Sequence, residues 1–330
     1  MPSLPRIRRG RVRDNAGVVG ARPRVSELTA SGLTWVHLDS LDPDTVNDLR
    51  ERFGWHALDV EDVLSKRQRP KVDVYPDEAY LFGVLHFPVY DKNVQRLNAA
   101  ELDFFLGPDY LVTIPNVELL PVTRLFHRLE EDETFRESLF AKGSGRLLYE
   151  VLDDLYDYCF PILDKIALKL RQIDEEIDEV APRAKDRVRD IHKVKQEIIS
   201  YRKIVRPQRP TLRQLERGVE RFLPEELELY FDDIVDASER IWDLLDNYKE
   251  VVEALEDTNE SLISHQQNDI LYVLTIFSVV MLPLTFITGF FGMNVRFPGF
   301  DSATGFLATI ASMIVVVGAM LGFFRWKKWL

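Results

Sequence analysis

The sequence predicts a membrane protein with an α+β or α/β domain at the N-terminus, followed by long helices and two C-terminal transmembrane helices. Three observations support this fold class. Short strand-like runs alternate with helical ones between Leu33 and Ile114, which indicates a mixed domain. The next part is helical in pattern. Two uncharged apolar runs follow, 270–291 and 305–324, and about 20 helical residues cover about 30 Å, the thickness of a bilayer's hydrocarbon core.

Residues 1–30 contain a cluster of five arginines between Arg6 and Arg13. No apolar segment follows the cluster, so these residues do not resemble a secretory signal. We predict a basic, disordered tail, with weak contact to anionic lipid head groups as the alternative.

Residues 31–140 are predicted to form the α/β domain. A short helix is expected over Pro43–Phe53, because Asp42 or Asp44 can cap its start and Gly54 follows its end. The Gly107–Asp109 segment suits the turn of a hairpin between the last two strands. The predicted strands are, in order, Leu33–Leu38, Ala79–Val89, Glu101–Leu106 and Tyr110–Ile114.

Residues 141–222 are predicted to be a region of long helices. The first helix covers Gly145–Val180, and Pro161 either kinks it or is accommodated in it. Arg183–Val205 is the second helix. Pro207 and Pro210 are expected to end it.

Residues 223–291 are predicted to form a stalk helix that continues into the first membrane span. Between Pro224 and Pro283 the chain has no proline or glycine, and a helix of about 67 residues is about 100 Å long. A break near residues 265–267 is the alternative. A helix of this length cannot bury its apolar face within one subunit, so we expect an oligomer.

The residues flanking the two spans predict the orientation in the membrane. The outer loop, 292–304, carries only Arg296 and Asp301, whereas the tail, 325–330, has three basic residues. The positive-inside rule then places the C-terminus in the cytoplasm, and two spans place the N-terminal body there too. Trp326 and Trp329 suit an interfacial anchor.

One face of the first span differs from the others. At helical spacing it carries small or hydroxyl side chains among leucines, whereas the other faces are Ile, Val, Phe and Leu. Such a face either packs helices closely, the commoner purpose, or lines a wet path in which leucines form constrictions. The face consists of Asn268, Leu271, Leu274 or Thr275, Ser278, Leu282, Thr285 and Gly289.

Composition excludes several classes of function. The net charge is −12, which argues against a nucleic-acid partner and favours cations. The single cysteine, Cys159, allows neither an intrachain disulfide nor a cysteine metal site. The sequence shows no nucleophile constellation, phosphate loop or zinc signature, so we do not expect an enzyme.

Two separate motifs resemble the CorA family of divalent-cation channels, within the two-span superfamily marked by Gly-Met-Asn. One motif covers Met281–Asn294 and ends in Gly292, Met293 and Asn294; the terminal Lys327–Leu330 accompanies it. The other consists of Leu58–Leu64 with Gln68–Lys71, far upstream. The resemblance covers about residues 33–330.

The resemblance implies a funnel-shaped homopentamer in the cell (inner) membrane. Gly292, Met293 and Asn294 would form the entrance, where a ring of Asn294 binds hydrated Mg2+. Gly289, Thr285, Ser278 and Leu282 would line the pore. Leu274 and Leu271 would form a hydrophobic gate, with Asn268 as a polar ring near the cytoplasmic exit and Asp257 as a carboxylate ring further down the stalk.

The family also implies a regulatory Mg2+ site between subunits. Asp62 would face Asp233 of the neighbouring subunit, with Glu61 assisting. Two carboxylates that approach across an interface repel unless a cation lies between them, and Mg2+ needs only one or two carboxylates because it keeps its waters. The expected function is uptake of Mg2+, and of Co2+, through a pore that opens when cytoplasmic Mg2+ falls.

The outer loop departs from the family pattern. Arg296 stands where an acidic residue is usual, and Phe297–Phe300 replaces a Met-Pro-Glu-Leu run. The alternative function is a ZntB-like carrier of Zn2+, Co2+ or Ni2+ driven by a proton gradient. Such a carrier usually has a carboxylate inside the membrane, and neither span contains one. A membrane-anchored scaffold that conducts nothing is a third hypothesis.

Overall fold

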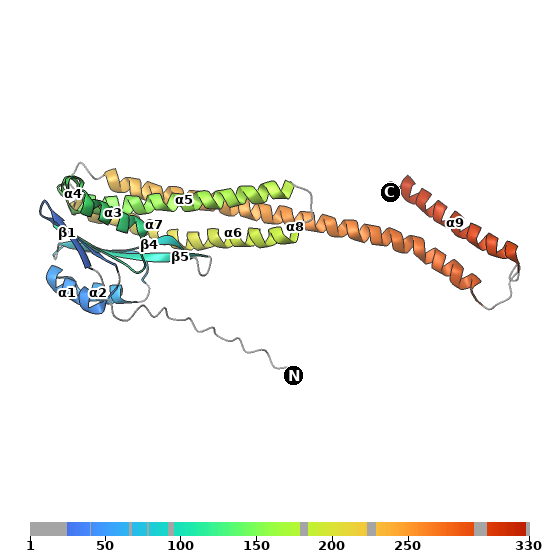
Figure 1. Ribbon diagram of the computed structural model, residues 1–330, viewed down its shortest axis with the longest axis horizontal. Helices are drawn as coiled ribbons and strands as arrows, with labels where there is room; N and C mark the ends of the chain where they lie inside the picture. The colour runs from blue at the N-terminus through green and yellow to red at the C-terminus, as the bar shows by residue number, and fades with distance from the viewer. Residues whose placement is uncertain are drawn as a thin grey trace, which may run out of the picture. The chain divides into compact units, whose positions relative to one another are not determined.

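The computed structural model of the chain describes residues 25–39, 41–65, 68–77, 79–91, 96–178, 184–222, 229–293 and 302–327 (Figure 1). These residues form two compact units. The first contains the described residues up to 178 and those from 189 to 255. The second contains 184–188 and everything described from 256 onwards.

A six-stranded mixed sheet forms the middle layer of the first unit. Strands β2 and β6 pair in parallel, and the other neighbouring pairs are antiparallel. The predicted hairpin is confirmed: β5 and β6 pair around the turn, where the Gly107 N–H donates to the Tyr110 carbonyl at 2.9 Å. Across the sheet the strands are β1 Val25–Ala30, β2 Leu33–Leu38, β6 Tyr110–Pro115, β5 Arg96–Leu106, β4 Tyr80–Asp91 and β3 Lys71–Tyr75.

Helices cover both faces of this sheet (Figure 1). On one face lie α1, Pro43–Phe53, and α2, Ala57–Leu64, over a core in which the Trp55 and Phe105 rings stack with centroids 3.6 Å apart. The other core is larger and contains Trp35. It is covered by α3 Leu120–Glu131, α4 Glu133–Phe140, α5 Ser144–Asp178, α6 Ala184–Val205, α7 Gln208–Val219 and the first part of α8, Leu229–Phe291.

Helix α1 forms where the sequence predicts it, and for the predicted reason. The Asp42 side chain accepts a hydrogen bond from the Thr45 N–H at 3.0 Å, which caps the free N–H groups of the first turn. Gly54 ends the helix in the left-handed region, with φ 74°.

The predicted disordered tail extends too far. Residues 25–30 form β1, which pairs with β2 through a turn at Ser31 and Gly32, both at positive φ. A two-residue turn with both residues at positive φ has a backbone twist that matches the right-handed twist of the two strands it joins. The prediction failed because β1 is an edge strand with alternating exposure, so it lacks the apolar run by which a buried strand is recognised.

The long helices follow the prediction, with one difference at the prolines. Pro161 is accommodated inside α5. Helix α6 ends at Val205, before Pro207, as expected. Pro210 lies in the first turn of α7 and not between helices. Proline has no N–H, and this costs nothing there, because the N–H groups of a first turn have no carbonyl acceptor within the helix.

Helix α8 is continuous over 63 residues. It has no break at residues 265–267, so the continuous-helix prediction is confirmed for the described part of the chain. The predicted beginning of this helix, 223–228, lies outside the described residues.

The second unit contains the two apolar helices. Within the described residues, α8 and α9, Ala303–Trp326, are long and apolar enough to cross a membrane. Ser302 caps α9 by accepting a hydrogen bond from the Gly305 N–H at 3.1 Å. The predicted spans therefore coincide with helices, while part of the outer loop, 294–301, and the tail residues 328–330 lie outside the description.

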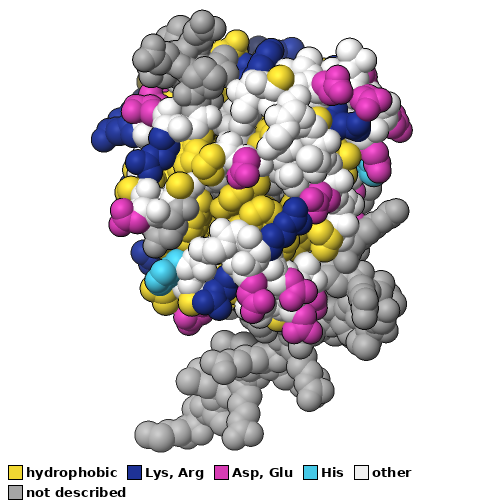
Figure 2. Space-filling view, turned by 90° about the vertical axis from the view of Figure 1, so that its left-hand side faces the viewer, with side chains coloured by type: hydrophobic (Ala, Val, Ile, Leu, Met, Phe, Trp, Pro, Cys, Tyr) yellow, Lys and Arg dark blue, Asp and Glu magenta, His cyan; other side chains and the backbone are white. Residues whose placement is uncertain are grey.

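Figure 2 shows the end of the molecule that bears α4, β1 and α1. Basic and acidic side chains alternate there around a hydrophobic area. Charges of both signs on one face are typical of the surface of a soluble domain.

Candidate functional site

The predicted regulatory carboxylate Asp62 lies near the end of α2. This helix turns Asp59, Val60 and Val63 toward the sheet, so Asp62 lies at the edge of the buried face, half-buried, and Glu61 points to solvent. The arrangement follows from helical spacing, because Val63 lies four residues after Asp59 and three after Val60, and positions three or four residues apart share one face of a helix.

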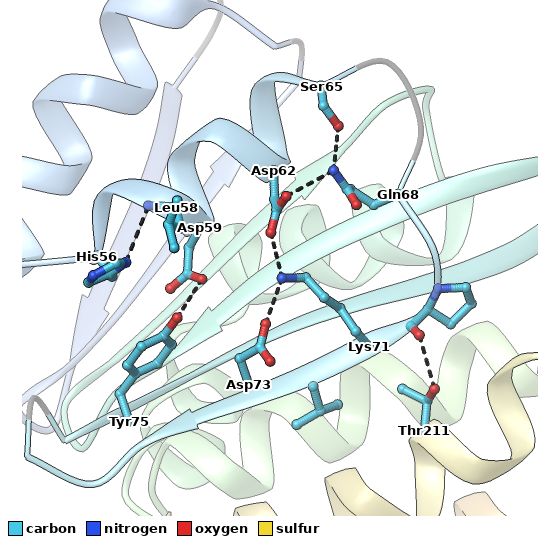
Figure 3. A network of polar contacts seen from close by, with 12 residues as sticks. His56, Leu58, Asp59, Asp62, Ser65, Gln68, Lys71, Asp73, Tyr75 and Thr211 are labelled. Atoms are coloured by element: carbon cyan, nitrogen blue, oxygen red, sulfur yellow. Dashed lines mark hydrogen bonds and ion pairs between the residues drawn. The ribbon is translucent and has the colours of Figure 1, made fainter.

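Two residues that follow α2, Gln68 and Lys71, hold the Asp62 carboxylate (Figure 3). Gln68 Nε2 donates to Asp62 Oδ1 at 2.9 Å and to Ser65 Oγ at 2.6 Å. Lys71 Nζ lies 2.5 Å from Asp62 Oδ2 and 2.6 Å from Asp73 Oδ2. The ammonium of Lys71 therefore bridges two carboxylates.

Alternation along β3 explains this bridge. Lys71 and Asp73 are two residues apart on one strand, so both side chains point to the face that α2 covers. Burial alone would lower the pKa of Lys71, but its hydrogen bonds to Asp62 and Asp73 outweigh burial and hold the pKa above its usual value. Lys71 is therefore a permanent cation at this place. Its Nζ also lies 4.9 Å from the centre of the Phe82 ring.

Two other carboxyls lie under α2 or in the sheet beside it. Asp59 accepts hydrogen bonds from the hydroxyls of Tyr75, at 2.8 Å, and Tyr80, at 2.7 Å. Asp103 on β5 is fully buried, and among the described residues neither of its oxygens has a hydrogen-bond partner. Burial raises the pKa of Asp103 well above its usual value, and the nearby carboxylate of Glu101 adds to the shift. Asp103 is therefore a structural weak point.

Replacing Asp103 by leucine should stabilise the protein. Leucine has the same branched shape, and the cross-strand neighbours Val84 and Ile114 are apolar. Removing a buried polar group that has no partner is expected to raise the free energy of unfolding by about 1–3 kcal/mol. Thermal unfolding of the purified full chain in detergent measures the effect. Asp103→Asn, which keeps the shape and the polarity, should give no such gain, and equal stabilisation by both variants would contradict the explanation.

The second predicted carboxylate, Asp233, lies in the second turn of α8. It is exposed, and the hydroxyl of Tyr149 on α5 lies 3.4 Å from its Oδ2. Asp153, one turn further along α5, also interacts with Asp233. Burial, followed by the charges of neighbouring carboxylates, raises the pKa of Asp153 to about 6. Several carboxylates therefore gather at this end of α8, beside Arg146, which pairs with Glu150.

The pKa of Asp153 predicts how stability varies with pH. An unfolded aspartate has a pKa of about 3.9, so the folded state binds this proton more tightly than the unfolded state. The contribution of Asp153 to stability is therefore largest below pH 4 and is lost as the pH rises toward 6 and above. In Mg2+-free buffer, Asp153→Asn should be more stable than the unmodified chain at pH 7.5, by at most about 1 kcal/mol because the group is partly solvated. Thermal unfolding of both proteins at pH 7.5 and at pH 4.5 measures the difference in stability between them. The same difference at both pH values would contradict the raised pKa of Asp153.

The structure does not bring Asp62 and Asp233 together into one metal site. Within the described ranges, no group of three or more histidine, cysteine or carboxylate side chains could hold a metal ion. Each carboxylate instead has its own partners, Lys71 and Gln68 for the first and Tyr149 for the second. The Asp62 and Asp233 carboxylates both reach solvent, and carboxylate oxygens are ligands that suit Mg2+. The two residues therefore fit a site that a second subunit completes. That site stays a prediction.

The predicted pore residues all lie on α8 and are accessible. Thr285 Oγ1 donates to the Met281 carbonyl at 2.9 Å, and Ser278 Oγ to the Leu274 carbonyl at 2.8 Å. Hydroxyls that bond to their own helix need no water, so they fit both a helix interface and a pore wall. Accessible residues of the same set are Asn268, Leu271, Leu274, Leu282 and Gly289, and Asp257 is exposed in the part of α8 that precedes them.

The two glycines near the end of α8, Gly289 and Gly292, differ in how much space a side chain would find there. A Cβ on Gly292 would lie 2.8 Å from the Thr288 carbonyl oxygen, so the chain itself requires glycine there. Among the described residues, a Cβ on Gly289 would meet no atom within 4 Å, so no described part of a single chain requires that glycine. Met293 is exposed after the helix ends. Asn294 and Arg296 lie outside the described residues.

Sequence reasoning missed the roles of Lys71, Gln68 and Asp73. The Gln68–Lys71 segment was recognised as a family motif, but its contact with Asp62 was not foreseen. A signal was present: alternation places Lys71 and Asp73 on one face of a strand that follows the helix of Asp62.

Comparisons with known proteins agree with this geometry. The profile of the CorA-like Mg2+ transporter protein family matches residues 30–327. The cobalt/magnesium transport protein CorA of Thermotoga maritima is 31% identical over 300 residues, which cover 90% of this chain and 83% of that protein. The zinc transport protein ZntB of Pectobacterium carotovorum is 24% identical over 302 residues, covering 87% of this chain and 90% of that protein.

A solved structure shows the same fold. The CorA magnesium transporter of Methanocaldococcus jannaschii superimposes with a TM-score of 0.77 at 21% identity, over 92% of this chain and 94% of that one. The mixed sheet, the long helix and the two apolar C-terminal helices occur in the same arrangement as expected from the sequence. The family profile and the Thermotoga relative both cover most of the chain, so this protein belongs to the CorA family.

Proposed function

We propose that this protein is a channel for divalent cations that takes up Mg2+, and also Co2+, through a pore lined by α8 of several identical subunits. The observation that carries the proposal is α8 itself. One continuous helix joins the acidic region at Asp233 to an uncharged apolar span whose accessible face holds serine, threonine and glycine. The family membership and the names of the Thermotoga and Methanocaldococcus relatives support magnesium and cobalt as cargo.

The chemistry of the span suits a hydrated ion. Mg2+ loses its waters reluctantly, so a pore for it needs polar atoms that bind the hydration shell rather than carboxylates that bind the bare ion. Asn294 at the entrance and Thr285 further in would supply such atoms. Leu271 and Leu274 would close the pore, because a narrow ring of apolar side chains expels water.

Regulation is proposed to act through a Mg2+ ion between subunits. Asp62 and Glu61 of one subunit would face Asp233 of the next in a homopentamer. When Mg2+ fills this site it holds the subunits together and the pore stays closed; when cytoplasmic Mg2+ falls, the carboxylates repel and the open state gains population. The protein would lie in the cell (inner) membrane, with both termini in the cytoplasm.

A zinc carrier is the second candidate, and the outer loop favours it. Arg296 stands where magnesium-transporting members of the family usually have an acidic residue, and the zinc-transporting members also lack that acidic loop. The ZntB relative has a zinc transport name. The uncharged spans oppose proton coupling, because a proton-driven carrier needs a group that titrates inside the membrane.

Ion flux into proteoliposomes separates the two functions. The full chain is reconstituted, and the influx of Mg2+ and of Zn2+ is followed with a trapped fluorescent indicator, with and without a pH gradient. A channel for Mg2+ gives influx that depends on membrane potential and ignores the pH gradient. Zinc influx that requires the pH gradient, with little Mg2+ influx, would overturn the proposal in favour of the carrier.

A further inference from the structure

The bridge between Asp62 and Asp73 already contains a cation. Lys71 Nζ lies within hydrogen-bond distance of both carboxylates, at 2.5 and 2.6 Å. Gln68 Nε2 donates a hydrogen bond to the other oxygen of Asp62, Oδ1, at 2.9 Å. Both oxygens of Asp62 are therefore in use before any metal ion arrives (Figure 3).

The bridge is accessible to an ion from solution. The side chains of Lys71 and Asp62 are each 29% exposed, and that of Asp73 is 41% exposed. An ammonium is a compact, strongly hydrated point charge on a flexible stem. It can leave Asp62 without becoming unpaired, because Asp73 retains it.

The backbone of Lys71 is fixed, so only the side chain can move. Thr211 Oγ1 on α7 donates to the Pro70 carbonyl at 3.2 Å, and Gln214 Nε2 donates to the Val72 carbonyl at 2.8 Å. These bonds hold β3 immediately before and after the lysine, on an edge strand that has a neighbour on only one side. Lys71 therefore always starts within reach of Asp62.

We propose that Lys71 competes with Mg2+ for Asp62 and thereby sets the cytoplasmic Mg2+ concentration at which the channel closes. This inference rests on the proposed function, in which Asp62 is part of the sensing site. Mg2+ carries two charges to the lysine's one and can engage the carboxylate of the neighbouring subunit as well, so it displaces the ammonium only when its concentration is high enough. The ion pair between Lys71 and Asp62 therefore raises the Mg2+ concentration at which the channel closes.

The test measures how internal Mg2+ inhibits influx. Isotopically labelled Mg2+ is added outside proteoliposomes that contain the full chain and increasing concentrations of unlabelled Mg2+. Lys71→Gln removes the competing charge and should lower the half-inhibitory concentration about fivefold, the size expected for a partly exposed ion pair of about 1 kcal/mol. Lys71→Arg keeps the charge and should leave the concentration within about twofold of the unmodified value.

Arg69 provides a matched control for long-range charge effects. It lies two residues from Lys71 and is exposed, and within the described part of the chain no hydrogen bond or ion pair joins it to Asp62. Arg69→Gln should leave the half-inhibitory concentration unchanged. Equal shifts from Arg69→Gln and Lys71→Gln would overturn direct competition. Lys71→Met, which keeps the aliphatic stem near Phe82, repeats the test where glutamine disturbs the strand.

Asp62→Asn distinguishes failure of this inference from failure of the proposed function. If Asp62→Asn removes the inhibition and Lys71→Gln leaves it unchanged, the lysine does not compete and the sensing site stands. If Asp62→Asn also leaves the inhibition unchanged, Asp62 does not sense Mg2+, and both the site and the competition are overturned.

Discussion

Replacing Asn294 by alanine should abolish Mg2+ uptake. Gly292 and Met293 lead out of α8 to this residue, and the proposed function places its side chain at the pore entrance. An amide oxygen can accept hydrogen bonds from the waters of a hydrated ion, whereas a methyl group cannot. In the proposed homopentamer every subunit would contribute one such side chain, so the substitution would remove the whole ring at once. We expect uptake to fall to the level of empty proteoliposomes.

The control for this experiment is Thr304→Ala. Thr304 lies at the other end of the outer loop, and its hydroxyl contacts Ser302 at the start of α9 at 3.0 Å. The control variant should transport at the normal rate. Gel filtration shows whether each variant remains assembled. An Asn294→Ala channel that is assembled and still takes up Mg2+ normally would contradict the entrance role.

Asp62→Asn and Asp233→Asn should each raise the internal Mg2+ concentration that half-inhibits influx, by about tenfold or more. Each variant removes one of the charges that are proposed to hold the bridging ion, and a hydrogen bond to a charged group contributes about 1.5–3 kcal/mol. In the double variant the half-inhibitory Mg2+ concentration should be little higher than in either single variant, because both substitutions remove the same interaction.

Asp236→Asn is the matched control for the second carboxylate. Asp236 is exposed on α8 like Asp233, three residues further along the same helix, and loses the same charge. Normal inhibition in this control and weak inhibition in Asp233→Asn would locate the effect at one position. Fully additive effects of Asp62→Asn and Asp233→Asn would contradict a shared ion.

The sequence predicted the elements that have strong local signals. Helix α1 has an aspartate cap and a terminal glycine, the β5–β6 hairpin has its turn residues, and both spans have length and composition. Strands β1 and β3 were missed because edge strands bury one side only and have no long apolar run. Pro210 was assigned to a helix end because sequence alone does not distinguish the residue after a helix from the first turn of the next one.

The candidate site was predictable only in part. The family resemblance predicts Asp62 and Asp233 as a site, but periodicity could not show that Lys71 already pairs with Asp62, because that contact depends on how α2 and β3 lie relative to each other. Asp103 was not foreseen either, since an aspartate in a strand is usually exposed. The entrance and pore roles depend on several copies of the chain, and no property of one copy determines them.

The continuity of α8 has a consequence for rotation. A helix turns by about 100° per residue, so within the apolar part of α8 the direction in which Leu271 points fixes the direction in which Thr285 points. Adding one residue between them would turn the later part of the proposed pore-lining face by about 100°, whereas adding seven would bring it back almost into register. The spacing of these residues therefore sets which side chains share one face of the helix, as well as how far apart they lie.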